Sequence, residues 1–367
     1  MFLALRDLRF AKGRFALMGS VVALITLLLV MLSGLTAGLA NQSTSAIAAL
    51  PADRIVFGAP PGGEAKASYT ESEVTPGQLD QWRAEPGVSG VSALGINQTR
   101  FQSLGDDGAA RGTANVAVFG TDAAVADRTA PAPAPLTDET VVIGESLAKE
   151  LDLAKGSEVA VSGTTLTVSA VVPDQWYSHT GVVWTTLDTW RRIAHAGAEE
   201  ATVLAVAFDA GASVDADAAN AAAGTVSATP TESFQALGSY KSENGSLLLM
   251  QAFLYGISAL VIVAFLTVWT VQRTRDIAVL KALGASTGYV LRDALVQAGI
   301  VLLAGAAVGG TIGGVGGFFA AQAAPFLVTP LTSILPVAGV VVLGLAGAVL
   351  AVRGVTRVDP VLALGGN

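Results

Sequence analysis

The sequence contains no cysteine and, for its 367 residues, little charge. The absence of cysteine excludes disulfide frameworks, thiolate metal sites, iron–sulfur clusters and cysteine nucleophiles. Charged residues make up 14% of the chain and hydrophobic residues 52%, whereas a typical soluble domain is roughly 25% charged. This balance favours a membrane protein.

Motifs that carry catalysis are also missing. The sequence has no phosphate-binding P-loop, no HExxH or GxSxG motif and no zinc-ligand spacing. The glycine-rich run at 309–314 has no strand before it, so we interpret Gly310 and Gly314 as a helix-packing surface, like Gly34 and Gly38 in an earlier apolar run. We therefore expect no catalytic residue, no metal site, no intrinsic cofactor and no nucleic-acid partner.

Three stretches contain no charged residue: 15–40, 244–272 and 294–352. About 20 apolar residues suffice for a helix to cross the hydrocarbon core, and three prolines between 325 and 336 divide the longest stretch into two such helices. The first stretch is too long for the core of a cleaved signal peptide, which has about 7–15 residues. We therefore predict four transmembrane helices, at 15–40, 247–271, 294–320 and 333–352.

The distribution of charge predicts the orientation in the cell membrane. Residues 1–14 contain four Lys or Arg residues and one acid, and 272–293 and 353–367 also carry more basic than acidic residues. Basic residues close to membrane helices favour the cytoplasmic side. Residues 41–246 instead hold 25 acidic and 11 basic residues. We expect 1–14, an amphipathic segment, 272–293 and the 353–367 tail to be cytoplasmic, and 41–246 to lie outside.

Residues 41–246 are expected to form a mixed domain of ordinary size. Short runs rich in Val, Ile and Thr predict strands, and amphipathic runs between them predict helices. Expected strands include 88–94, 115–119, 140–143, 158–162, 165–172, 181–185 and 202–208, and expected helices follow Thr75-Pro76 and cover 145–151 and 187–194. The fold class is therefore a membrane protein with four transmembrane α-helices and an α+β extracytoplasmic domain inserted between helices 1 and 2.

Four segments resemble the MacB/FtsX-like family of ABC-transporter permeases. VVIGESLAKELDLAKGSEVAVSGTTLTVSAVV (141–172) is similar to the family's extracytoplasmic core domain, and RTRDIAVLKALGAS (273–286) to its signature after the second span. VTRVDPVLAL (355–364) and LRDLRFAKGRFAL (5–17) resemble its closing and opening segments. The resemblance covers nearly the whole chain and implies a homodimer in the membrane lipid, with two copies of a cytoplasmic ATP-binding subunit that hydrolyse the ATP.

The resemblance also implies that 272–293 is a coupling segment against the ATP-binding subunit. Apolar side chains at helical spacing could fill a groove on that partner, and the basic side chains could meet its acidic groups. Gly284 is placed to end the helix. The candidate partner-binding residues are Arg273, Arg275, Ile277, Leu280, Lys281 and Leu283.

The short layout and the segment DQWYSHTGVVW (174–184) resemble HrtB-type haem exporter permeases. This resemblance implies haem as the transported substrate, which requires an axial ligand such as His, Tyr or Met within apolar walls. Haem is expected to enter laterally from the outer leaflet, between the first and second spans of the dimer, and to leave near Tyr177 or His179. The candidate haem contacts are Tyr177, His179, Met18, Met31, Met250, Tyr255 and Glu64.

Other functions stay open at this point. The same family layout suits a permease that exports peptides or lipoproteins, or an FtsX-like mechanotransmitter that controls a cell-wall hydrolase. A ligand sensor whose last spans only anchor it is a further alternative, although it would have no use for a coupling segment.

Overall fold

The computed structural model describes residues 12–105, 107–121, 136–272, 279 and 283–356. The chain divides into two compact units. A membrane unit contains the residues up to Leu39 and from Asn244 onward, and an outer unit contains Ala40–Glu243. Each unit is described by itself.

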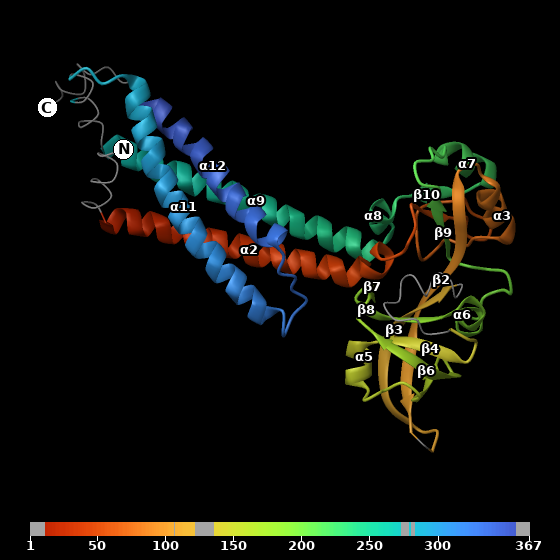
Figure 1. The fold of residues 1–367 in the computed structure, drawn as a ribbon. Helices are drawn as coiled ribbons and strands as arrows, with labels where there is room; N and C mark the ends of the chain where they lie inside the picture. Colours follow the sequence, from red (N-terminus) through yellow and green to blue (C-terminus); the bar gives the residue numbers. More distant parts are fainter. Residues whose placement is uncertain (1–11, 106, 122–135, 273–278, 280–282, 357–367) are drawn as a thin grey trace. The chain divides into compact units, whose positions relative to one another are not determined.

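The membrane unit is built from four long helices (Figure 1). They are α2 (Lys12–Ala48), α9 (Gly238–Gln272), α11 (Thr287–Ala320) and α12 (Pro330–Thr356). Within the described residues, these four are long and apolar enough to cross a membrane. Both α2 and α9 continue without a break beyond the charge-free stretches, so each contributes its far end to the outer unit.

Helix α2 packs against α11 through a row of glycines. Gly305, Gly309 and Gly313 recur every four residues on α11, and a Cβ on Gly309 would clash with the backbone carbonyl of Ala23 on α2. Such a row lets two backbones approach closely. Of the glycines predicted for packing, Gly314 has open space around it. The prediction of a small-residue surface was therefore right about the helix and wrong about Gly314.

The other predicted glycine pair, on α2, accommodates a loop instead of a helix. A Cβ on Gly34 would clash with the ring of Phe326, and one on Gly38 with the backbone of Pro325. The amide of Leu327 donates to the Gly34 carbonyl at 3.0 Å. The connection between α11 and α12 is therefore fixed to α2 by an inserted aromatic ring.

Helices α2 and α9 also contact each other directly. Gln251 Nε2 donates to Thr36 Oγ1 at 3.1 Å, and the rings of Phe15 and Trp269 meet edge to face, 5.9 Å apart. These contacts lie near opposite ends of the apolar stretch, so the two helices run antiparallel along it.

The outer unit contains one ten-stranded sheet and short helices. Its strands are β1 (Arg54–Phe57), β2 (Val88–Leu104), β3 (Ala110–Thr121), β4 (Thr140–Gly144), β5 (Glu158–Val161), β6 (Thr164–Val172), β7 (Trp176–Tyr177), β8 (Thr180–Thr186), β9 (Val203–Phe208) and β10 (Val226–Ala228). The strand order is β10-β1-β9-β2-β3-β8-β4-β6-β5, with β7 paired to β8. The predicted fold class, four apolar helices with an α+β domain inserted after the first, is confirmed.

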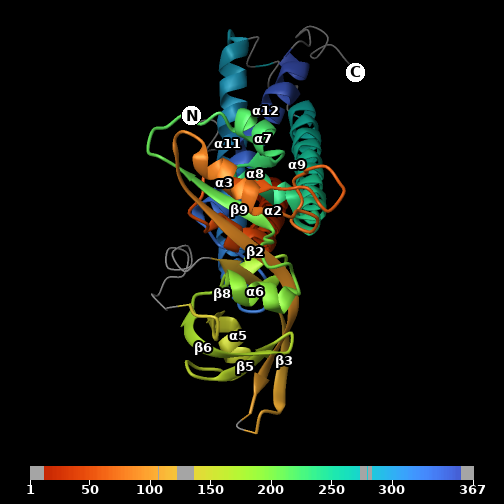
Figure 2. The ribbon, with the colours of Figure 1, turned by 90° about the vertical axis from the view of Figure 1, so that its right-hand side faces the viewer.

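The long strand β2 connects the strands on the β9 side of the sheet with those on the β3 side (Figure 2). Its first residues pair with β9, and the rest pair with β3. Residues 101–103 of β2 also pair with β5. β5 pairs with β6 as well. Six strands therefore form a closed ring of neighbours, in the order β2, β3, β8, β4, β6 and β5, with β5 paired back to β2.

Helices cover both faces of the sheet near β1 and β9. α3 (Pro76–Ala84) and α7 (Ala216–Ala223) pack over β1 and β9, with Trp82 buried between them. α3 begins at a capping box formed by Thr75 and Gln78. On the opposite face the last turns of α2 enter the core, where Ala46 and Ile47 are fully buried.

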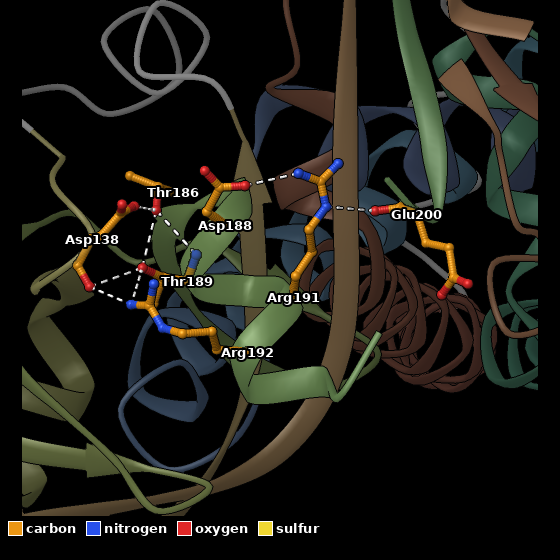
Figure 3. Close-up of polar contacts among 7 residues, drawn as sticks. All are labelled: Asp138, Thr186, Asp188, Thr189, Arg191, Arg192 and Glu200. Atoms are coloured by element: carbon orange, nitrogen blue, oxygen red, sulfur yellow. Dashed lines mark hydrogen bonds and ion pairs between the residues drawn. The ribbon is translucent and has the colours of Figure 1, made fainter. Parts of the chain in front are cut away.

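Helix α6 (Leu187–Ala194) is held at both ends by polar contacts (Figure 3). Its N-cap Thr186 bonds Asp138, and Arg192 donates to the Asp138 carbonyl at 2.6 Å. Arg191 pairs with Asp188 at 2.8 Å and donates to the Glu200 carbonyl at 3.0 Å. The helix is thus fixed to the segments before β4 and before β9.

Candidate functional site

The candidate methionines of the membrane unit differ in their surroundings. Met18 is 3% exposed and belongs to the helix core. The Met31 sulfur lies over Gly316 of α11. Met250 is 57% exposed on α9, between Leu249 and Phe253, which are equally open. Among these three thioethers, that of Met250 belongs to the exposed residue, whereas Met18 is buried and Met31 half-buried.

Tyr255 is packed within the membrane unit. Its ring lies against α12, where a Cβ added to Gly339 would stand 2.9 Å from the Tyr255 ring. Glu64 belongs to the outer unit and is exposed in the loop between β1 and α3. Glu64 is therefore free to contact a ligand, whereas Tyr255 would first have to leave its packing.

Tyr177 lies in the aromatic core of the outer unit. It is 5% exposed, and its ring meets those of Tyr69 and Phe119 edge to face at 5.9 and 5.4 Å. Burial raises the pKa of the Tyr177 hydroxyl well above its ordinary value. This keeps the phenol neutral, which does not suit a phenolate ligand for iron.

His179 lies in the two-residue turn between β7 and β8. Ser178 and His179 both have positive φ, 46° and 65°, the requirement of a type I′ hairpin turn. This conformation usually selects Asn or Gly, and a non-glycine residue there costs about 1–3 kcal/mol. Backbone strain of this kind gathers at functional sites.

The imidazole of His179 already has partners. Its Nε2 lies 2.9 Å from Glu243 Oε2 and 3.1 Å from Ser43 Oγ. Because a carboxylate only accepts hydrogen bonds, Nε2 carries the proton, and both oxygens accept from it. Since the serine and the carboxylate share one nitrogen, this is not the relay of a hydrolase triad, in which they occupy opposite nitrogens.

A cavity of about 380 Å³ lies beside this turn. Its lining includes His179 and Trp176, together with the polar or acidic residues Thr113, Asn115, Ser146, Glu150 and Asp174. Asp174 accepts from the Ser146 amide at 2.9 Å and so caps α5 (Glu145–Glu150). Apolar side chains such as Val116, Leu147 and Val182 line only part of it. Haem requires apolar walls, and the carboxylates of Glu150 and Asp174 would repel its propionates, so this cavity suits haem poorly.

Five of the six candidate partner-binding residues lie outside the described residues: Arg273, Arg275, Ile277, Leu280 and Lys281. Leu283 is described and is 80% exposed. Its amide donates to the Val279 carbonyl at 3.0 Å, as in a helical turn. Gly284 follows with a φ of 96°, the conformation with which glycine ends helices.

Sequence reasoning did not find the partners of the β7–β8 turn. Ser43, Ser239 and Glu243 are ordinary polar residues at the ends of apolar stretches. The one local signal was the Ser-His pair, which occupies the place of the usual Asn-Gly turn between two short strands. Its contacts join residues 136 and 64 positions apart, which no local pattern reveals.

The fold defines a class of protein: a membrane subunit with four spans and a large domain inserted between the first two. The chain belongs to the MacB/FtsX-like family of ABC-transporter permeases, since residues 15–224 match the MacB-like periplasmic core domain and 248–360 the FtsX-like permease C-terminal region. The outer unit is therefore extracytoplasmic, and the family implies a partner subunit that binds ATP.

Curated relatives match along their whole length. A Staphylococcus epidermidis (strain ATCC 12228) protein, provisionally named hemin transport system permease protein HrtB, is 24% identical over all of both chains. An ABC transporter permease of Mycobacterium tuberculosis (strain ATCC 25618 / H37Rv), described as uncharacterized, is also 24% identical over 100% of this chain and 99% of the other. The periplasmic region of MacB from Actinobacillus actinomycetemcomitans is a solved structure with a TM-score of 0.38 and 11% identity, covering 51% of this chain and 92% of that one.

Proposed function

We propose that this chain is the permease of a haem efflux pump. In this proposal two copies form a homodimer with cytoplasmic termini, and two ATP-binding subunits drive the export of haem taken from the outer leaflet. The relatives named for hemin transport support this cargo, because they match the chain from end to end.

The exposed thioether of Met250 is the observation that carries the proposal. It lies on an apolar face of α9 with Leu249, Phe253, Ile257 and Leu260, all more than half exposed. A methionine sulfur is an established axial ligand of haem iron, and the apolar face suits the macrocycle. The face could close around haem when a second copy of the chain lies opposite.

The burial of the other candidate haem contacts decides the role that the proposal gives them. Glu64 is exposed and can act as an oxygen ligand. Met18, Met31 and Tyr255 are packed between helices, so they shape the bundle. Tyr177 and His179 have other partners in the outer unit, so the proposal assigns them no contact with haem iron.

The test is a haem titration of the purified full chain in detergent, followed by the Soret band. We expect a saturable shift at about one haem per dimer. Met250→Ala should weaken binding about tenfold or more, while Leu249→Ala, which removes a neighbouring exposed apolar side chain, should have a small effect. Metal-free porphyrin should bind both variants alike, because it has no iron to ligate.

Two outcomes would contradict the proposal. Absorption that rises without saturation would be partition into the micelle, and the cargo would then be a peptide, a lipoprotein or a cell-wall partner. Equal effects of the two substitutions would remove Met250 as a ligand. In cells that also express the ATP-binding subunit, Met250→Ala should lower haem resistance at unchanged permease abundance.

A further inference from the structure

The turn between β7 and β8 contacts both helices that continue into the membrane unit. Gln42 and Ser43 of α2 contact the turn, and Ser45 contacts Trp176 of the adjoining strand β7. α9 contributes Ser239 and Glu243. All of these residues belong to the outer unit. The turn is therefore a point at which both helices are held by the same short piece of the sheet.

The contact with α2 uses the backbone of the turn. The amides of Ser178 and His179 donate to the carbonyls of Ser43 and Gln42, both at 3.0 Å. The amide of Trp176 donates to Ser45 Oγ at 2.9 Å. The left-handed conformation of residues 178 and 179 accompanies this arrangement, and the next residues of α2 are buried in the core of the sheet.

The contact with α9 uses side chains alone. Ser178 Oγ lies 3.0 Å from Ser239 Oγ, and His179 Nε2 lies 2.9 Å from Glu243 Oε2. The side chains of His179 and Glu243 are 29% and 43% exposed, so water can replace either partner. The first turns of α9, 238–243, are exposed or half-buried. In these turns Tyr240 packs half-buried against the core of the sheet, beside Phe234. Ala46 and Ile47 of α2 are fully buried, so the end of α9 is held by less buried side chains than the end of α2.

We propose that the β7–β8 turn is a latch: it stays fixed to α2 and releases α9 during each transport cycle. Ser178 and His179 are its positioning residues, and Ser239 and Glu243 are the groups released. α9 is suited to this movement because it runs without a break from the latch to Gln272, the first residue of the coupling segment. The latch rests on the permease class of the chain and does not depend on which cargo it carries.

Engineered cysteines test the latch directly, because the natural chain has none. In Ser178→Cys/Ser239→Cys the two thiols replace hydroxyls 3.0 Å apart, a separation compatible with a disulfide. The full complex with its ATP-binding subunit is oxidised in lipid, either without nucleotide or trapped with ATP and vanadate. We expect cross-linking to be at least fivefold slower in the trapped state. Oxidation should abolish ATP hydrolysis by the full complex until a reductant is added.

A matched control is Thr137→Cys/Thr140→Cys, whose hydroxyls are 3.2 Å apart at the start of β4, away from the β7–β8 turn in the sequence. Its cross-linking should be the same in both nucleotide states and should leave turnover unchanged. Equal cross-linking of the latch pair in both states would overturn the proposal, as would full turnover of the cross-linked protein. Neither result depends on haem, so a failed haem titration leaves this test intact.

Glu243 provides a second test in the same cysteine background. Glu243→Ala should slow cross-linking without nucleotide several-fold, because α9 then loses its stronger contact with the turn. Glu243→Gln keeps an oxygen that accepts from His179 and should cross-link at close to the original rate. If Glu243→Ala cross-links as fast as the parent, the His179–Glu243 contact does not belong to the latch.

Discussion

Trp190 lies directly on Gly120. A Cβ at position 120 would clash with the Trp190 side chain, and Gly95, the register partner of Gly120 on β2, is covered by the same indole. Two glycines opposite each other thus leave room on the sheet for the one large side chain with which α6 docks. α6 is also tied to Asp138 and Glu200. The packing of Trp190 and these polar contacts together fix the position of the helix.

Gly120→Ala should therefore destabilise the outer unit. Overpacking a filled core costs about 1–3 kcal/mol, and the clash involves the Cβ and ring of Trp190, which cannot swing aside. Thermal unfolding of the full chain in detergent measures the effect. Gly90→Ala on β2, where a Cβ meets nothing within 4 Å, is the control and should unfold at the parent's temperature. Equal melting temperatures would contradict this view of α6.

Gly309→Ala should loosen the contact between α2 and α11. The added methyl clashes with the Ala23 carbonyl, so the helices must separate, at a cost of about 1–3 kcal/mol. Gly314→Ala adds the same methyl five residues later in open space, and it should be neutral or slightly stabilising because alanine favours helix. Thermal stability in detergent would compare the two. A smaller loss for Gly309→Ala than for Gly314→Ala would refute the glycine row.

Alkaline pH should weaken the fold through its buried tyrosines. Burial raises the pKa of Tyr177, so its contribution is fully present below the unfolded tyrosine value of about 10 and is lost as pH rises through the folded value. Melting temperatures measured from pH 8 to 11 should fall above about pH 10. Tyr177→Phe should make that fall shallower and leave stability at pH 8 nearly unchanged. A fall of unaltered steepness would show that Tyr177 does not contribute.

Leu283 should contribute to binding of the ATP-binding subunit. Its side chain is 80% exposed, so Leu283→Asp should not disturb the fold, yet it removes an apolar contact and adds a negative charge. We expect about tenfold weaker binding, equivalent to about 1.4 kcal/mol, measured with both purified subunits. Leu283→Ile retains an apolar side chain and should bind normally. Normal binding of the Asp variant would place the interface elsewhere.

Local sequence patterns predicted the bounds of those helices and strands that have caps or hydrophobic periodicity within their own residues. The helix at 187–194 begins and ends as predicted, because Thr186 caps its start and three of its side chains are buried on one side. The predicted strands 88–94 and 115–119 are parts of the much longer β2 and β3. Much of the remainder of that hairpin is half-buried or exposed and carries many polar side chains. Its far part pairs with β5, which lies far away in the sequence, so no local pattern shows where the strands end.

The candidate site was harder to anticipate for the same reason. The sequence singled out His179, but not Ser43 or Glu243, its partners on two different helices. It also could not distinguish Met250, which is exposed, from Met18, which is buried, because both lie in uniformly apolar stretches. Burial within a helix bundle depends on which faces meet, and a charge-free sequence has little periodicity to show this.

The closure of β5 onto β2 has a consequence for how the domain meets other chains. An open sheet offers a row of unpaired amides and carbonyls onto which an extended peptide, or a neighbouring copy, can add a strand. In the described part of this domain that row is occupied from β2 round to β5, and the other end of the sheet is the three-residue β10. Anything that binds the closed part must therefore be recognised by side chains, and copies crowded in one membrane have little backbone through which to aggregate.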